Sequence, residues 1–194
     1  MKQPIDSQPK TYLTPEEYLA IERKAEYRSE YFNGEMFAMT GASRKHNLIT
    51  LNIAGELRQQ SKGKPCEVYV NDMRVRIPLT GLYTYPDVVV VCGEPEFEDD
   101  FVDTLLNPTL IVEVLSETTE SYDRGRKSSY YRTVQSLAEY LLVSQDEYKV
   151  EQYVRQADGR WLLTDIRSPE GVIELASVPC VLALKEVYDR VTPS

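Results

Sequence analysis

The chain has 194 residues, a hydrophobic fraction of 42% and a formal net charge of −9. These values predict one globular domain over residues 12–194, after a loose polar tail at 1–11. The acidic charge argues against binding nucleic acid through a broad positive surface. Because no apolar run approaches a membrane span and the N-terminus lacks the apolar core of a signal peptide, we expect a cytoplasmic protein with no membrane partner.

The first half of the chain predicts a short helix, a hairpin and a long helix. TPEE at 14–17 supplies an N-cap, a proline at the first helical position and a capping glutamate, so a helix begins there. Asn33-Gly34 lies between two strand-like halves and predicts a β-hairpin, because both residues accept positive φ. Apolar spacing predicts an amphipathic helix over about 43–62, ended by Gly63 and Pro65.

Strands dominate the second half. EVYVNDMRVRIP predicts one or two half-buried strands, while PDVVVVC and LIVEVL are apolar runs typical of strands buried on both faces. The acidic segment EPEFEDDFVD predicts a solvated loop. A helix over about 121–134, a strand pair in EYLLVS and YKVEQYVR, two further strands and a short closing helix follow. The whole pattern is α+β, with a central mixed β-sheet flanked by helices.

Cysteine and histidine content limits the metal chemistry. Cys66, Cys92 and Cys180 are scattered and lack C-x-x-C spacing, so the sequence indicates neither a disulfide framework nor a zinc knuckle, and we expect small buried side chains. His46 is the single histidine, whereas zinc and HNH-type sites need several imidazoles. Any metal ion must therefore be held by oxygen.

Two carboxylates interrupt the apolar strands. Glu113 lies inside LIVEVL and Asp87 heads the preceding run, and a lone buried carboxylate needs a cation to offset its desolvation. An ion pair of Glu113 with Arg126 or Lys127 would satisfy this need without any function. Alternatively, both carboxylates and the Val114 carbonyl could hold Mg²⁺, with Lys127 orienting water or stabilising charge on a phosphate.

These motifs resemble the PD-(D/E)-x-K restriction-endonuclease-like superfamily. Pro86-Asp87 matches its first half and Glu113-Val114 begins the second, although Leu115 stands where lysine is usual. Within the superfamily the chain is similar to the Uma-two family of putative restriction endonucleases, over about residues 12–190. The matching residues are Glu30, Gly34-Glu35, His46, Pro86-Asp87-Val88, Glu113-Val114-Leu115-Ser116, Asp123, Lys127, Tyr130 and Glu139-Tyr140.

The resemblance implies a restriction-endonuclease-like core and a metal-dependent endonuclease that hydrolyses phosphodiester bonds in DNA with Mg²⁺ or Mn²⁺. Asp87, Glu113 and Val114 would hold the metal, and Lys127 would take the role that Leu115 cannot. Analogy with restriction enzymes that cut both strands implies a homodimer.

Three further residues are candidates on the same resemblance. The hairpin would add a carboxylate, and Glu30 is preferred to Glu35, which begins the second strand. His46 and Arg126 are candidate substrate contacts, although a lone histidine favours a helix cap or a hydrogen bond in the core for His46.

A second hypothesis is a catalytically inert binding or oligomerisation module that keeps the nuclease-like fold. The acidic net charge and the missing lysine at Leu115 favour it. Thermal stabilisation by Mg²⁺ or Mn²⁺ separates the two hypotheses, because only a folded-state metal site produces it.

Overall fold

The computed structural model describes residues 12–116 and 119–193, so the predicted tail at 1–11 lies outside it. Its helical elements are α1 (Pro15–Glu22), α2 (Arg44–Gln60), α3 (Glu120–Tyr122), the π-helical turn η1 (Asp123–Lys127), α4 (Ser128–Tyr131) and α5 (Leu184–Val187). Its strands are β1 (Ser29–Phe32), β2 (Glu35–Ala38), β3 (Cys66–Val70), β4 (Arg74–Ile77), β5 (Leu82–Thr84), β6 (Val88–Cys92), β7 (Thr104–Leu105), β8 (Leu110–Val114), β9 (Glu139–Val143), β10 (Val150–Arg155), β11 (Trp161–Ile166), β12 (Val172–Glu174) and β13 (Val181–Ala183).

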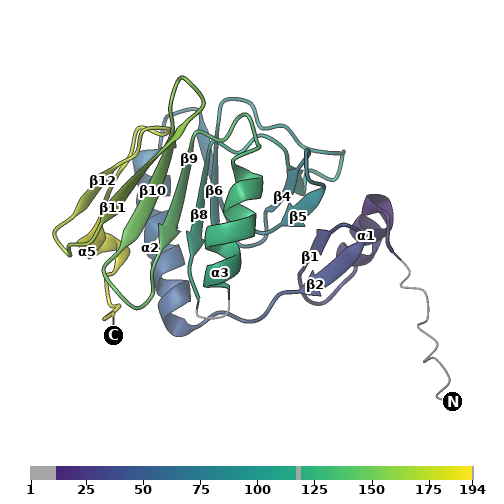
Figure 1. The fold of residues 1–194 in the computed structure, drawn as a ribbon, viewed down its shortest axis with the longest axis horizontal. Helices are drawn as coiled ribbons and strands as arrows, with labels where there is room; N and C mark the ends of the chain where they lie inside the picture. Colours follow the sequence, from purple (N-terminus) through teal and green to yellow (C-terminus); the bar gives the residue numbers. More distant parts are fainter. Residues whose placement is uncertain (1–11, 117–118, 194) are drawn as a thin grey trace, which may run out of the picture.

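A six-stranded mixed sheet forms the centre of the fold, in the order β11-β10-β9-β8-β6-β3 (Figure 1). Strands β8 and β9 run parallel, and the other neighbouring pairs run antiparallel. A five-stranded sheet in the order β2-β1-β5-β4-β7 and a β12–β13 pair accompany it. The α+β class with a central mixed sheet is therefore confirmed.

The two faces of the central sheet are covered by different layers. On one face α2, α5 and the β12–β13 pair pack around residues such as Ile53, Val112 and Leu182. On the other, α4 and the five-stranded sheet pack around Val75 and Ile111. The consecutive elements α3, η1 and α4 form one helical segment, which we call the α3–α4 rod. Figure 1 shows α2 and this rod on opposite sides of the sheet. Burial on both faces explains why β6 is a continuous apolar run and why β8 is apolar apart from Glu113.

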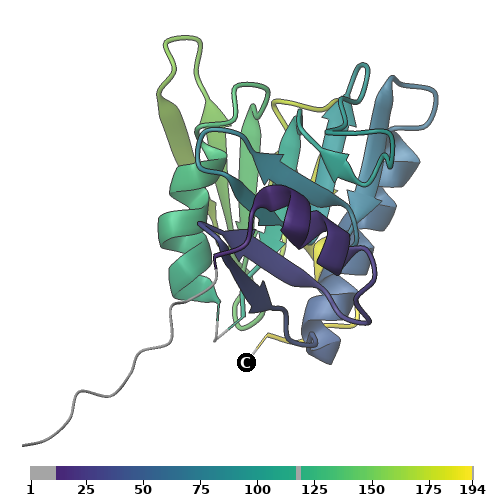
Figure 2. The same cartoon turned by 90° about the vertical axis from the view of Figure 1, so that its right-hand side faces the viewer.

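The N-terminal predictions are confirmed in detail. Thr14 caps α1 with a complete capping box, in which Glu17 reaches back to the Thr14 N–H. Asn33 and Gly34 turn the β1–β2 hairpin with φ of 50° and 87°. Helix α2 begins after Ser43. The Ser43 hydroxyl caps the helix by accepting a hydrogen bond from the backbone N–H of His46. In Figure 2 the α1–β1–β2 segment faces the viewer, with the α3–α4 rod on one side and α2 on the other.

Three segments differ from the sequence expectations. The acidic segment is not simply a solvated loop, because Phe97 forms an isolated bridge with Leu105 of β7, and Asp99 and Asp103 both bind Arg23. The helix predicted over about 121–134 ends earlier, at Tyr131, and contains the turn η1. The closing helix is only the four residues of α5, because β13 occupies the residues before it.

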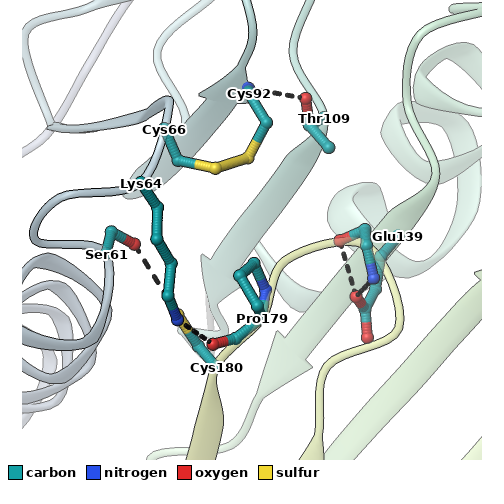
Figure 3. The surroundings of a disulfide bond; sticks show 9 residues. Ser61, Lys64, Cys66, Cys92, Thr109, Glu139, Pro179 and Cys180 are labelled. Carbon is teal, nitrogen blue, oxygen red and sulfur yellow. Dashed lines mark hydrogen bonds between the residues drawn. A yellow bond between two sulfur atoms is a disulfide. The ribbon is translucent and has the colours of Figure 1, made fainter.

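Cys66 and Cys92 correct the expectation of three unpaired cysteines. They are directly opposed in the β3–β6 register, and their sulfur atoms form a disulfide (Figure 3). Their separation of 26 residues gives no local signal, since the pairing depends on which strands become neighbours. Cys180 is the buried thiol that the sequence predicted, with its Sγ 3.6 Å from Ser61 Oγ.

Within the described ranges, none of the helices has both the length and the apolar character required to cross a bilayer.

Candidate active site

Strand register brings Asp87 and Glu113 together. Strands β6 and β8 pair antiparallel with Val88 opposite Val112, so the next position places Asp87 opposite Glu113. Because side chains alternate between the two faces along each strand, these opposed residues project their side chains from the same face of the sheet. The Val114 N–H donates to Asp87 Oδ2 at 2.7 Å, which fastens the two strand ends to each other.

Lys127 is the cation that offsets the burial of Glu113. The Glu113 residue is 4% exposed, and Lys127 Nζ lies 2.9 Å from its Oε1. The Tyr131 hydroxyl donates to the same oxygen at 2.7 Å. Glu113 is thus held by an ammonium and a phenol, both from the rod that follows β8.

Lys127 also contacts two further acids. Its Nζ lies 3.1 Å from Glu30 Oε1 and 3.7 Å from Asp123 Oδ1. The Thr84 hydroxyl donates to Glu30 as well, which fixes that carboxylate over β5. One ammonium is therefore surrounded by three carboxylates, which we call the acid cluster: Glu30, Glu113 and Asp123.

The turn η1 accounts for the position of Lys127. Asp123 and Lys127 stand at its two ends and are 4% and 5% exposed, whereas Arg126 between them is exposed. A π turn inserts an extra residue into a helix and changes the direction of the side chains that follow, and such turns are frequent at functional sites. Lys127 approaches Glu113 from the helix, while Leu115 is buried in the core.

Burial and charge shift the pKa values of the cluster. Burial raises the pKa of Glu113 to about 8; the Lys127 charge opposes this shift, and the Asp123 and Asp87 charges add to it. Burial alone would lower the pKa of Lys127, but attraction by Glu113 and the other acids raises it well above the usual value. Burial also raises the pKa of Asp123. Negative groups outnumber positive ones here, so the site favours a further cation.

His46 lies beside this cluster, on Asp87. Its Nε2 is 3.2 Å from Asp87 Oδ1, while its backbone N–H is bound by the Ser43 cap. His46 is therefore a residue of the α2 cap whose ring lies against Asp87, and its contact with a substrate stays a prediction. His46 and Glu30 both line a cleft that opens over these acids. Within the part of the chain that the structure describes, neither Arg126 nor Glu35 is among the lining residues.

Asp87, Glu113 and Asp123 line a cleft of about 1140 Å³. We call these three acids, with Lys127 against them, the floor of the cleft. Gln145, which the sequence did not single out, joins two of its sides: its Nε2 donates to the Leu115 carbonyl at 2.6 Å, and its Oε1 accepts from the Ser43 hydroxyl at 2.6 Å. Because β9 runs parallel to β8, the residues just after both strands lie at the same edge of the sheet. That topology is the signal by which Gln145 could have been found.

The donor set suits an oxygen-preferring ion. In the part of the chain that the structure describes, no three His, Cys, Asp or Glu side chains are arranged as a complete metal-binding group. Magnesium, however, usually takes one or two carboxylates and completes its shell with water and phosphate oxygens. Asp87 and Glu113, with Val114 lining the same cleft, fit that requirement.

One family model and two relatives match most of the chain. A family model described as "Putative restriction endonuclease", Uma2, matches residues 15–185. Two uncharacterized proteins of Synechocystis sp. are similar along most of their length: sll1609 is 40% identical over 84% of this chain and 93% of its own, and slr1290 is 35% identical over 94% of each.

A solved structure shares the fold. The crystal structure of a putative nuclease belonging to DUF820 from Anabaena variabilis has a TM-score of 0.73, at 18% sequence identity. The match covers 90% of this chain and 97% of that one. The two chains therefore share one fold along most of their length.

Proposed function

This chain belongs to the Uma2 family of putative restriction endonucleases, and on that premise we propose that it is a metal-dependent endonuclease hydrolysing phosphodiester bonds in DNA. The observation that carries the proposal is the opposition of Asp87 and Glu113 on the cleft floor, with Lys127 against them. The resemblance to a putative nuclease in fold supports the same reading.

Each floor residue has a role in this proposal. Asp87 and Glu113 would hold Mg²⁺ or Mn²⁺, with the Val114 carbonyl as a third oxygen ligand. When bound, the ion lowers the pKa of a coordinated water and stabilises negative charge on the phosphate. Lys127 would orient the attacking water or stabilise the same charge.

Two residues act through these groups. Glu30 contacts Lys127 and would keep its ammonium over the floor. His46 contacts Asp87 Oδ1 and would orient that carboxylate, as partners of metal ligands commonly do. A homodimer, by analogy with restriction enzymes, stays a prediction.

The test combines cleavage with metal binding. Single-stranded, duplex and branched DNA are incubated with Mn²⁺ and wild type, Asp87→Asn or Glu113→Gln. Glu151→Gln is the matched control, because Glu151 is also nearly buried and paired with two cations but does not line the cleft. We expect both floor variants to lose at least about 100-fold in cleavage, the scale of losing one preorganised electrostatic group, and the control to lose none.

Thermal unfolding with and without Mn²⁺ gives the second readout. A metal site on the floor predicts a concentration-dependent rise in the wild-type melting temperature that the floor variants lack. Cleavage retained by Asp87→Asn at matched metal concentration would sink the mechanism. Absence of both cleavage and metal stabilisation in the wild type would favour the inert module.

A further inference from the structure

The β1–β2 hairpin presents two exposed apolar side chains to the cleft. Phe37 is the cross-strand partner of Glu30, and both line the cleft. Directly opposed residues have Cβ atoms about 4.5–5.5 Å apart, so the Phe37 ring stands one strand away from an acid that contacts Lys127. Phe37 and Met39 are 48% and 40% exposed. Single exposed apolar residues are common, but these two share a wall with the candidate site.

A cation continues the same hairpin face. The Met39 N–H donates to the Arg28 carbonyl at 2.9 Å, which extends the β1–β2 register by one pair. Residues two apart along a strand share a face, so Arg28 and Met39 lie beside Glu30 and Phe37. We call these four the hairpin wall: Arg28, Glu30, Phe37 and Met39, all of which line the cleft.

The Arg28 guanidinium is available to a ligand. Its nearest acid is Asp72 at 3.4 Å, and the two side chains are 42% and 76% exposed, so the ion pair is weak and readily exchanged. Arg44, at the start of α2, is exposed and lines the cleft as well. The cleft lining therefore offers two exposed cations, Arg28 and Arg44, although the exposed acids Asp72 and Asp146 line it too.

The candidate catalytic groups are almost fully buried. The Glu113 and Lys127 side chains are 5% and 7% exposed, so a phosphodiester group must enter the cleft to reach them. Duplex DNA is stiff, with a persistence length of about 50 nm, and a chain of net charge −9 lacks the broad positive surface that would bend it. An unpaired strand bends freely and offers bases that stack on aromatic rings.

We infer that the cleft takes an unpaired stretch of DNA, with a base stacked on Phe37 against Met39 and the adjoining phosphates bound by Arg28 and Arg44. This inference rests on the proposed endonuclease function and deepens it by naming the substrate class. Single-stranded DNA, or duplex opened locally, is then the substrate, and Phe37 is a binding residue that the family motif does not include.

The experiment measures binding separately from cleavage. Fluorescence anisotropy gives the affinity of the Glu113→Gln protein for one labelled sequence as a single strand, a continuous duplex, a duplex with an internal unpaired bubble, and single-stranded RNA. Phe37→Ala, Phe37→Trp and the matched control Phe101→Ala are added to this background. Phe101 is 70% exposed and outside the cleft lining. Cleavage of the three DNA forms is followed with the same substitutions in otherwise wild-type protein.

We expect the single strand and the bubble to bind more tightly than the duplex. Phe37→Ala should weaken single-strand binding about tenfold, a typical loss for one base–aromatic contact, while Phe37→Trp and Phe101→Ala leave it unchanged. Equal binding of duplex and single strand, no effect of Phe37→Ala, no binding of any DNA, or tighter binding of the RNA would each overturn the inference.

The two proposals fail in different ways. If the wild type cuts continuous duplex as fast as single strand, and Phe37→Ala cuts equally well, the endonuclease function stands and the substrate inference falls. If Phe37-dependent binding of single strands is found but wild type cuts none of the DNA forms, the endonuclease function falls and the binding mode stands.

Discussion

Lys127→Met removes the cation that contacts Glu113 while keeping an unbranched side chain of similar length. In the wild type the Lys127 ammonium lies within 3.7 Å of Glu113, Glu30 and Asp123. Removing one partner of a buried ion pair typically costs about 3–5 kcal/mol, because the remaining charge is left uncompensated. We expect a loss of this size in the free energy of unfolding wherever Glu113 is ionised.

The loss should depend on pH. Burial raises the pKa of Glu113 to about 8, and removing Lys127 removes the attraction that opposes this shift. An acid whose folded pKa exceeds its unfolded value, about 4.3, binds a proton on folding. Its contribution to stability is therefore complete below the unfolded pKa and is lost as pH rises through the folded pKa. Relative to wild type, Lys127→Met should be less stable at about pH 9 than at about pH 5.

Urea denaturation across this pH range measures the effect. Lys149→Met is the matched control, because Lys149 is 12% exposed and lies 2.7 Å from Glu151, outside the cleft lining. Its loss should be smaller, since Glu151 keeps Arg124 as a second cation. A loss below about 1 kcal/mol at every pH would refute the reasoning, because Glu113 would then not depend on Lys127 for its burial.

Three other changes test the surroundings of the site and the frame that holds it. Tyr131→Phe removes the hydrogen bond to Glu113 and should lower metal affinity about 10-fold, as loss of a ligand's partner commonly does; titration with Mn²⁺ measures this, and unchanged affinity would contradict it. Cys66→Ser removes the disulfide, which closes a loop of 26 residues, and should lower the free energy of unfolding by about 3 kcal/mol. This difference between the two proteins must vanish when both are reduced. Hydrogen bonds from Arg23 lower the pKa of Asp103, so this carboxylate contributes stability above its unfolded pKa of about 3.9 that is lost as pH falls below it. In acid unfolding, the stability of Asp103→Asn should therefore depend less steeply on pH over that range than the stability of wild type. An identical slope for the two proteins would exclude the contribution.

Short-range signals could be predicted from the sequence because their partners lie a few residues apart. The Thr14 capping box and the Asn33-Gly34 turn depend on contacts within one turn of chain, and the structure contains both. The apolar runs around Val90 and Val112 also predicted strands buried on both faces correctly. Each of these signals is complete within a dozen residues, so no knowledge of the sheet order was needed.

Contacts that depend on strand order could not be predicted in this way. The Cys66–Cys92 bond requires β3 to pair with β6, and the role of Gln145 requires β9 to run parallel beside β8. The sequence offered Arg126 or Lys127 as the cation on Glu113, and the choice of Lys127 depends on the turn η1, which residue spacing does not predict. Tyr130 belongs to the family motif and stacks on Phe32, whereas the phenol on Glu113 comes from Tyr131, which the sequence analysis did not single out.

The distribution of charge reconciles an acidic chain with a proposed DNA substrate. The net charge of −9 argues against a broad DNA-binding surface, and the acid cluster would repel a phosphate from the floor. Two exposed cations, Arg28 and Arg44, also line the cleft, while the buried acids around Lys127 outnumber it. A divalent ion on Asp87 and Glu113 would remove this repulsion at the one point where a phosphate must approach. DNA binding and metal binding would then be coupled: each favours the other, so neither the acidic composition nor weak metal-free binding of DNA argues against the endonuclease.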